Sequence, residues 1–225
     1  PLSNQSVVLL NRGETTAALE LCDEAIRRDP GSDGGWSNRA LAKDSLGDPL
    51  GALEDLNKAL ELKQTRHSFT NRGTLRANSG DLRGAIRDYT RALELDDDAR
   101  TFRLSGMVRE KLGDRASALR EYGRAIGLAP DDPESWFLRG DARRRHGDPL
   151  GARDDLREFL KLSPESSNAA RARQLLQEGD PGSSVQPEPS RRSRPKGIPL
   201  TETTPLGREG QEGLAPGTPL ARVRL

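Results

Sequence analysis

The chain has 225 residues, with 36 Lys and Arg against 35 Asp and Glu, so its formal net charge is +1. This near-neutral balance excludes the strongly basic surface with which nucleic-acid binders neutralise phosphates. Hydrophobic and charged residues each make up 32% of the chain and the mean hydropathy is −0.78, which favours a thin fold whose helices each bury one apolar stripe.

A Gly followed by an acidic residue recurs along the chain at a nearly constant interval. The pairs are Gly13-Glu14, Gly47-Asp48, Gly80-Asp81, Gly113-Asp114 and Gly147-Asp148, spaced by 34, 33, 33 and 34 residues. A period of this length is typical of solenoids, in which each unit covers its apolar stripe with a neighbour. In chain order we expect a truncated first unit over 1–32, units over 33–65, 66–98, 99–132 and 133–164, a capping helix over 165–178, and a disordered Pro- and Gly-rich tail over 179–225.

The residues around each turn Gly predict a helix before it and a second helix after it. Eleven residues before Gly stands an aromatic residue and four residues later a small one, which places a large side chain beside a gap on one helical face. These pairs are Trp36 and Ala40, Phe69 and Gly73, Phe102 and Gly106, and Trp136 and Gly140. We expect the aromatic residues to be structural, the Gly to adopt a left-handed turn and the following Asp to cap the second helix.

Together the period, the aromatic–small pair, the Gly turn and the Pro that ends several units resemble the tetratricopeptide repeat family over residues 1–164. The resemblance implies an all-α, right-handed superhelical solenoid of about five helix-turn-helix units. It also implies a concave groove, lined by the first helix of each unit, that binds extended peptides. The truncated first unit is an indication that more repeats, or another domain, precede residue 1.

Asn residues stand nine positions before the turn Gly in the first three units, at Asn4, Asn38 and Asn71. Stacked units would place them in a row along the groove, where their amides could hold a peptide backbone. Three such side chains supply only about 1.5–4.5 kcal/mol in total, whereas micromolar binding needs about 8 kcal/mol. Other groove residues must therefore contribute, and by position these are His67, Thr70, Thr74, Arg100, Arg103, Met107 and Lys111.

The three cations among these residues make the fourth unit basic, which favours an acidic or C-terminal carboxylate ligand there. The family's carboxylate-clamp members use a Lys/Asn/Arg set across three units. Here Leu104 stands where the clamp Arg is expected, so the sequence argues against a true clamp.

A second regularity concerns charge. Arg39, Arg72 and Arg139 precede their turn Gly by eight residues, and Asp55, Asp88 and Asp155 follow the same Gly by eight. We expect ion pairs between helices, either within a unit or across to the next one. In the fourth unit Ser105 replaces the Arg while Glu121 keeps the acid, so this pair is broken there.

The sequence offers no catalytic, metal-binding or cofactor-binding constellation. The two histidines, His67 and His146, lie in different units without metal-ligand spacing. Cys22 is the only cysteine, so an intramolecular disulfide is excluded, and its place on an apolar stripe predicts a buried thiol. Neither a membrane span nor a secretory signal is visible, and 30 Arg against 6 Lys is typical of a GC-rich genome. We therefore expect a cytoplasmic bacterial protein.

The predicted function is a non-enzymatic protein–protein interaction scaffold that holds an extended peptide of a partner, with no nucleic acid, membrane or cofactor involved. One alternative is a regulatory arm of a larger enzyme, such as a protein kinase or a glycosyltransferase, whose catalytic domain precedes residue 1. Another is a self-assembly module that forms a homo-oligomer.

Overall fold

The structure is a computed structural model that describes residues 2–178. The description concerns the first of the two parts into which the chain divides, residues 1–184. The predicted tail over 179–225 lies outside the described residues. Residues 2–178 form eleven α-helices and no strand: α1 (Leu2–Asn11), α2 (Thr15–Arg28), α3 (Asp33–Ser45), α4 (Pro49–Leu62), α5 (Arg66–Asn78), α6 (Leu82–Leu95), α7 (Ala99–Lys111), α8 (Arg115–Leu128), α9 (Pro133–Arg145), α10 (Pro149–Leu162) and α11 (Ala169–Glu178).

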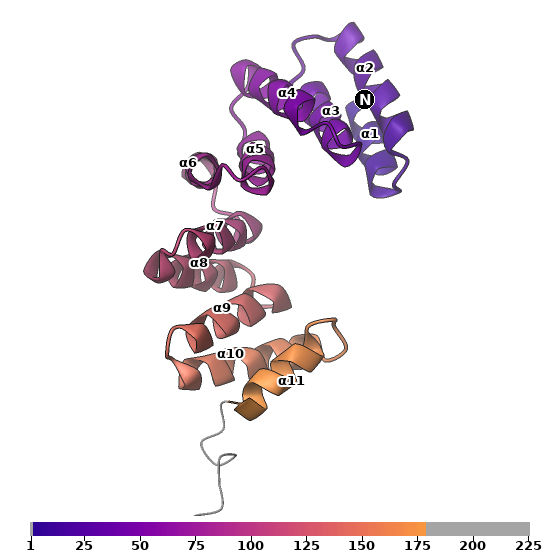
Figure 1. Ribbon diagram of the computed structural model, residues 1–225. Helices are drawn as coiled ribbons and strands as arrows, with labels where there is room; N and C mark the ends of the chain where they lie inside the picture. The colour runs from indigo at the N-terminus through magenta and orange to yellow at the C-terminus, as the bar shows by residue number, and fades with distance from the viewer. Residues whose placement is uncertain (1, 179–225) are drawn as a thin grey trace, which may run out of the picture. The chain divides into compact units, whose positions relative to one another are not determined.

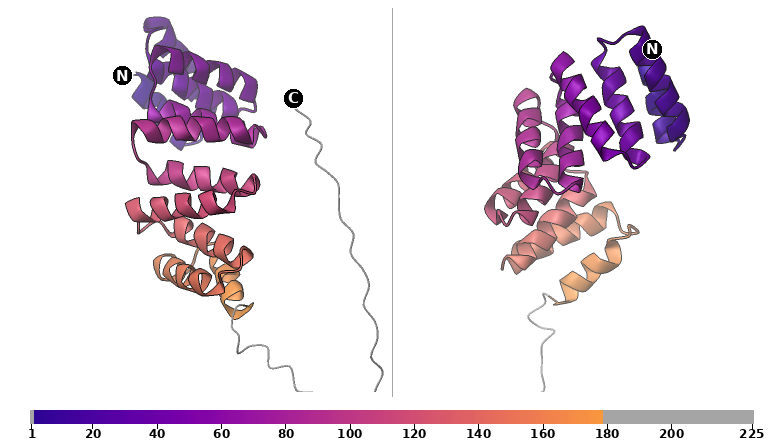
Figure 2. Two further views of the ribbon diagram at one scale, coloured as in Figure 1. Left: turned by 90° about the vertical axis from the view of Figure 1, so that its left-hand side faces the viewer. Right: turned by 45° about the horizontal axis from the view of Figure 1, so that its top comes forward.

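The helices pack as five consecutive pairs, which we call units one to five: α1–α2, α3–α4, α5–α6, α7–α8 and α9–α10. Each second helix also contacts the first helix of the next unit, and α1, α3, α5 and α7 contact one another in succession. Figure 1 shows the pairs following one another, and both views in Figure 2 show the same stacking. The predicted all-α solenoid of stacked helix pairs is therefore confirmed.

The turn between the two helices of a unit has the same form throughout. The five turn Gly have φ between 77° and 87°, a left-handed conformation that other residues rarely adopt. The next residue caps the second helix in four units: Asp81, for example, accepts from the backbone N–H of Gly84 at 2.9 Å. Glu14 of unit one occupies the same position, but no side-chain cap bond is formed there. Sequence prediction of the turn and of the Asp caps is confirmed.

The small residues of the first helices let the second helices approach closely. A Cβ added to Gly106 would lie 2.6 Å from the Tyr122 ring, and one added to Gly73 would lie 2.8 Å from the Tyr89 ring. Both distances are shorter than van der Waals contact, so only Gly fits beside each Tyr. In units two to five the core therefore combines a Gly or Ala in the first helix with a large buried side chain in the second, whereas unit one has Ser6 and Cys22 there.

The aromatic residues of the first helices are structural, as predicted. Phe69 and Phe102 are buried, while the indole N–H groups of the half-buried Trp36 and Trp136 donate to the carbonyls of Pro30 and Pro130 at 2.9 and 2.8 Å. These bonds fasten each Trp to the loop that enters its unit.

The last helix, α11, covers the exposed end of unit five. Its Ala172 and Leu175 pack against Leu156 and Phe159 of α10. The helix begins at Ala169 and not at residue 165 as the sequence predicted, because Ser166 and Ala169 take part in turn hydrogen bonds to Ser163 and Ser166. Each of the described helices is too short or too polar to cross a bilayer.

Candidate functional site

An open groove of about 620 Å³ runs across the first helices of units one to four. Its lining includes Asn4, Val7, Asn38, Leu41, His67, Asn71 and Arg100. The three predicted Asn therefore share one surface with His67 and Arg100, because the first helices of successive units lie next to one another. The sequence analysis missed the two apolar side chains, Val7 and Leu41, which are 40% and 37% exposed.

Asn38 is partly used in holding unit one against unit two. Its Nδ2 donates to the carbonyl of Ser3 at 2.7 Å and to Ser6 Oγ at 3.1 Å. Because a carbonyl only accepts, this contact fixes the orientation of the Asn38 amide. The amide oxygen of Asn38 is thus what this side chain can offer to a ligand.

Asn71 and Arg100 present unpaired polar groups to the groove. Within residues 2–178, the Asn71 amide has no hydrogen-bond partner and Arg100 forms no ion pair. Arg100 is exposed, as is His67 on the neighbouring helix. The groove therefore ends at unit four with the cationic side chain of Arg100, while Asp33 of unit two also lines it. An extended ligand bound here would meet a positive charge at unit four and a negative charge at unit two.

Two of the predicted groove residues lie elsewhere. Thr70 is 6% exposed, and its hydroxyl pairs with that of Thr101 at 3.0 Å. Thr74 donates to the Thr70 carbonyl at 2.9 Å and pairs with Tyr89 Oη at 3.2 Å. Thr70 joins units three and four and Thr74 joins the two helices of unit three, which corrects the sequence prediction for both.

Three further candidates in unit four are also separate from the groove. Arg103 forms ion pairs with Asp132 and Glu134 of unit five. Met107 packs against the buried cluster around Tyr122. Only Lys111, at the end of α7, is exposed. Arg103 and Met107 thus serve the contact between units four and five, a use that the sequence prediction did not include.

The predicted ion pairs between helices form within units two, three and five. Arg39 binds Asp55, Arg72 binds Asp88 and Arg139 binds Asp155, each through two hydrogen bonds of 2.7 to 3.0 Å. The three Asp side chains are only 2–4% exposed and the three Arg side chains 16–18%. These are bidentate pairs in a mostly buried setting, where both geometry and low dielectric strengthen them.

Each buried Asp has a second cation that the sequence analysis did not recognise. Lys43 Nζ lies 2.9 Å from Asp55, Arg76 Nη1 lies 2.7 Å from Asp88, and Arg143 Nη1 lies 2.9 Å from Asp155. The signal was present, because a Lys or Arg stands four residues before the turn Gly in units two to five, at Lys43, Arg76, Arg109 and Arg143. One helical turn separates this residue from the first cation, so both reach the same acid.

Each paired Arg also lies over the aromatic ring of its own unit, and Arg39 and Arg72 in addition bond to the unit before theirs. The Cζ atoms of Arg39, Arg72 and Arg139 lie 4.7, 5.6 and 5.1 Å from the centroids of Trp36, Phe69 and Trp136. Arg39 Nη1 also donates to Asp23 at 2.9 Å, and Arg72 Nη1 donates to Asn57 Oδ1 at 2.8 Å. One guanidinium thus joins both helices of a unit to the preceding unit.

Cys22 is buried with its side chain fully covered, as predicted, and burial raises the pKa of its thiol. Among residues 2–178, no group of three or more His, Cys, Asp and Glu side chains is placed to hold a metal ion.

A family model described as "Tetratricopeptide repeat" matches residues 107–177. Residues 107–177 therefore match the tetratricopeptide repeat family, and the helix pairs before them have the same Gly turn. Tetratricopeptide repeat protein 36 of Bos taurus is 40% identical over 65 residues, which make up 29% of this chain and 35% of that protein. The match therefore spans about a third of the length of this relative.

Solved tetratricopeptide-type structures share the fold. A crystal structure of MamA has a TM-score of 0.63 at 18% identity, covering 71% of this chain and 95% of that one. A crystal structure of YrrB, titled as a TPR protein with an unusual peptide-binding site, has a TM-score of 0.62 at 19% identity, covering 77% and 91%. Pilf of Pseudomonas aeruginosa has a TM-score of 0.71 at 17% identity, covering 79% and 86%. Likeness at these identities concerns the tetratricopeptide fold alone.

Proposed function

We propose that this protein is a scaffold that binds an extended segment of a partner protein in the groove across α1, α3, α5 and α7. The observation that carries the proposal is the composition of that groove. It combines an unpaired amide at Asn71, exposed apolar side chains at Val7 and Leu41, and an unpaired cation at Arg100. Tetratricopeptide folds bind protein segments, and the YrrB title names a peptide-binding site in such a fold.

The order of these groups along the groove specifies the ligand. Asn71 can both donate to and accept from a peptide backbone, and the Asn38 oxygen can accept. An apolar side chain of the ligand would cover Val7 and Leu41 in units one and two. An acidic side chain or a terminal carboxylate would pair with Arg100 in unit four. The expected motif is therefore an apolar residue and an acidic residue separated along an extended segment.

The expected free energies of these contacts show that all of these groups must contribute to reach micromolar binding. Two amide contacts contribute about 1–3 kcal/mol together, and micromolar binding needs about 8 kcal/mol. Burying apolar surface contributes about 25 cal/mol per Å², so covering about 100 Å² at Val7 and Leu41 adds about 2.5 kcal/mol. The charged contact at Arg100 supplies specificity and part of the remainder.

A random peptide library screened against the full chain tests the proposal. Enriched peptides should carry an apolar and an acidic residue, and Asn71→Ala and Arg100→Ala should each weaken their binding by about tenfold, equal to 1.4 kcal/mol. Lys111→Ala is the matched control, because Lys111 is exposed but lies outside the groove. A folded protein that enriches no peptide, or peptides that bind both groove variants unchanged, would refute a peptide-binding groove.

A further inference from the structure

Unit four contains a cavity at the position that a guanidinium group occupies in three other units. The cavity measures about 280 Å³ and opens to solvent between α6, α7 and α8. Its lining includes Thr90, Phe102, Ser105 and Glu121, which we call the unit-four cavity. It shares α7 with the groove of the proposed function but none of the groove's lining residues, and it does not depend on that function.

The walls of the unit-four cavity correspond one by one to the contacts of the paired Arg residues. In units two, three and five, an Arg at the position of Ser105 lies over the aromatic residue at the position of Phe102. It binds the acid at the position of Glu121. Arg39 and Arg72 also bind Asp23 and Asn57, and Thr90 stands at the same position of unit three. All three contact surfaces of a guanidinium are therefore present in unit four, while the Arg itself is replaced by Ser.

The groups that remain in unit four compensate only in part. Arg109, the second cation, binds Glu121 at 3.1 Å and donates to Ser105 Oγ at 3.3 Å. Glu121 thus has this one ion-pair partner within residues 2–178, whereas Asp55, Asp88 and Asp155 each have at least two. Burial raises the pKa of Glu121.

The aromatic ring has a replacement cation that can move away. Arg124 of α8 lies with its Cζ 4.7 Å from the Phe102 centroid and bonds Asp97 at 3.2 Å. Its side chain is 61% exposed, in contrast with the 16–18% of the paired Arg residues. An exposed long side chain exchanges rotamers at little cost, so Arg124 can uncover the ring.

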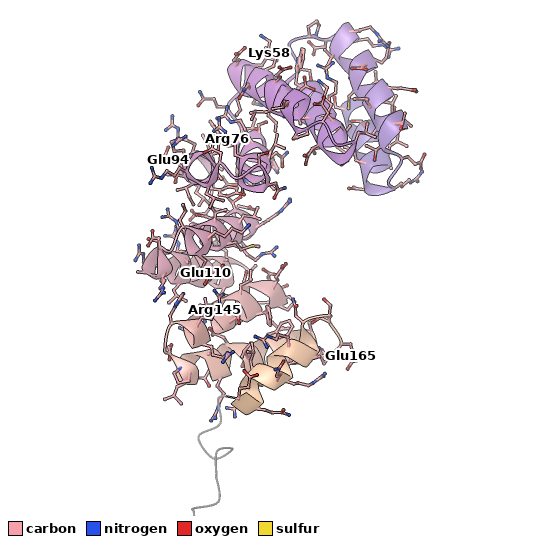
Figure 3. All side chains as sticks on the ribbon, in the orientation of Figure 1. Lys58, Arg76, Glu94, Glu110, Arg145 and Glu165 are labelled. Carbon is pink, nitrogen blue, oxygen red and sulfur yellow. The ribbon has the colours of Figure 1, made fainter. Side chains whose placement is uncertain are left out.

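The charge of the lining favours a cationic ligand. Three carboxylates, those of Glu94, Asp97 and Glu121, line the cavity with two guanidinium groups, those of Arg109 and Arg124. Glu94 lies on α6, as Figure 3 shows. A planar guanidinium can bind a carboxylate through two bonds and stack on a ring at the same time, which an ammonium cannot do.

We propose that the unit-four cavity binds an arginine side chain from a partner protein, inserted over Phe102 and paired with Glu121. The inserted guanidinium reproduces in trans the contacts that Arg39, Arg72 and Arg139 make within their own units. This gives the scaffold a second recognition site, specific for arginine, in addition to the groove.

Nuclear magnetic resonance titration of the ¹⁵N-labelled full chain tests the site with three probes: acetyl-Gly-Arg-Gly-amide, its Lys counterpart and its citrulline counterpart. Citrulline keeps the shape of arginine but lacks the charge. We expect the Arg probe to shift the amide signals of Thr90, Ser105 and Glu121 and to bind at least fivefold more tightly than the Lys probe. Equal binding of the citrulline probe, or shifts confined to the groove, would overturn the proposal.

Variants connect the signal to the cavity. Ser105→Arg places the missing side chain in the cavity and should weaken the Arg probe by at least tenfold. Glu121→Gln keeps the volume of the side chain but removes its charge, and should weaken binding of the Arg probe by at least fivefold. This second variant tests the site even if Ser105→Arg fails to fold. Asn71→Ala, which changes the groove, should leave the affinity unchanged. Unchanged binding by both cavity variants would refute an arginine site.

A final arm tests the origin of the arginine. The chain itself carries six arginines outside the described residues, namely Arg191, Arg192, Arg194, Arg208, Arg222 and Arg224. Replacing all six by Ala in the full chain should leave the affinity for the Arg probe unchanged if the natural ligand is a partner. A several-fold increase would overturn this assignment, because it would show that the chain's own arginines compete for the cavity.

Discussion

Units three and four have the same backbone design but use charge differently. In unit three, Arg72 and Arg76 enclose Asp88, whose side chain is 3% exposed. In unit four, Arg109 alone binds Glu121, whose side chain is 17% exposed, beside a cavity. The comparison teaches that the helix-turn-helix frame does not require the Arg–acid pair, since unit four folds without it. The pair joins the two helices of one unit, and where it is absent a cavity opens.

The largest effect on the free energy of unfolding is expected from removing Arg72 in unit three, where the Arg–acid pair is present. Arg72→Leu removes two bonds to Asp88 and one to Asn57. Because breaking a buried pair leaves a charge with too few partners, we expect a loss of about 3 kcal/mol in the free energy of unfolding. Urea denaturation measures it, and Arg91→Leu, which removes an exposed pair with Glu94, should change stability by less than about 0.5 kcal/mol. An equal effect of the two variants would reduce the buried pair to a surface contact.

Neutralising the buried acid should destabilise unit five more than unit four. Asp155→Asn leaves Arg139 and Arg143 without their shared carboxylate, whereas Glu121→Gln deprives only Arg109. We expect the change in unit five to cost about 2 kcal/mol more than the change in unit four. Denaturation curves of the two variants at the same pH compare them. Equal costs would mean that the second cation contributes nothing.

Fold and pair geometry were predictable where one offset decides the contact. The positions eight residues before and after each turn Gly place Arg72 and Asp88 on facing sides of one helix pair, so their bond followed from the repeat alone. The location of Thr70 between units three and four was not predictable, because the face of a helix on which a residue lies does not give its distance to the next unit. Ser37, Thr70 and Arg103 stand ten residues before their turn Gly, and all three contact the following unit. This offset would have predicted their contacts with the following unit.

The groove itself was predictable only in part. The regular spacing of the Asn residues placed Asn38 and Asn71 on one surface, as the structure shows. Consumption of the Asn38 amide by Ser3 could not be foreseen, since it depends on how closely α1 approaches α3. Likewise, Val7 and Leu41 carry no chemical signal in the sequence, because an exposed apolar residue is recognised only once its surroundings are known.

Filling the unit-four cavity should have a pH-dependent effect. Because the pKa of Glu121 is raised in the folded chain, this group contributes less stability as the pH rises above its unfolded value of about 4.3. Ser105→Arg supplies a cation that favours the ionised form and reverses this loss. The variant should therefore gain stability relative to the natural chain on going from pH 4 to pH 7, by about 1 kcal/mol for a partly buried pair. Thermal unfolding at both values measures the gain, and a pH-independent difference would argue against a contact with Glu121.

The smallest effect concerns the helix caps. Asp48, Asp81, Asp114 and Asp148 each accept from a backbone N–H three residues later, whereas Glu14 in unit one does not. Glu14→Asp should add the missing bond and stabilise α2 by about 0.5–1 kcal/mol. Hydrogen exchange of the α2 amides reports it, with Asp81→Ala as the reverse change. Exchange rates that do not respond to Glu14→Asp would show that the longer side chain is not what prevents capping.

The contacts between neighbouring units have a mechanical consequence. Ser37 bonds to Ser68 and Thr70 bonds to Thr101, so the joints on either side of unit three are each spanned by side chains 31 residues apart. Because the contacts connect each unit to the next, a pulling force along the chain loads the joints in series. A structure loaded in series yields first at its weakest joint and lengthens by one element at a time. The protein would thus behave as an extensible tether, giving way in steps and re-forming as the load falls.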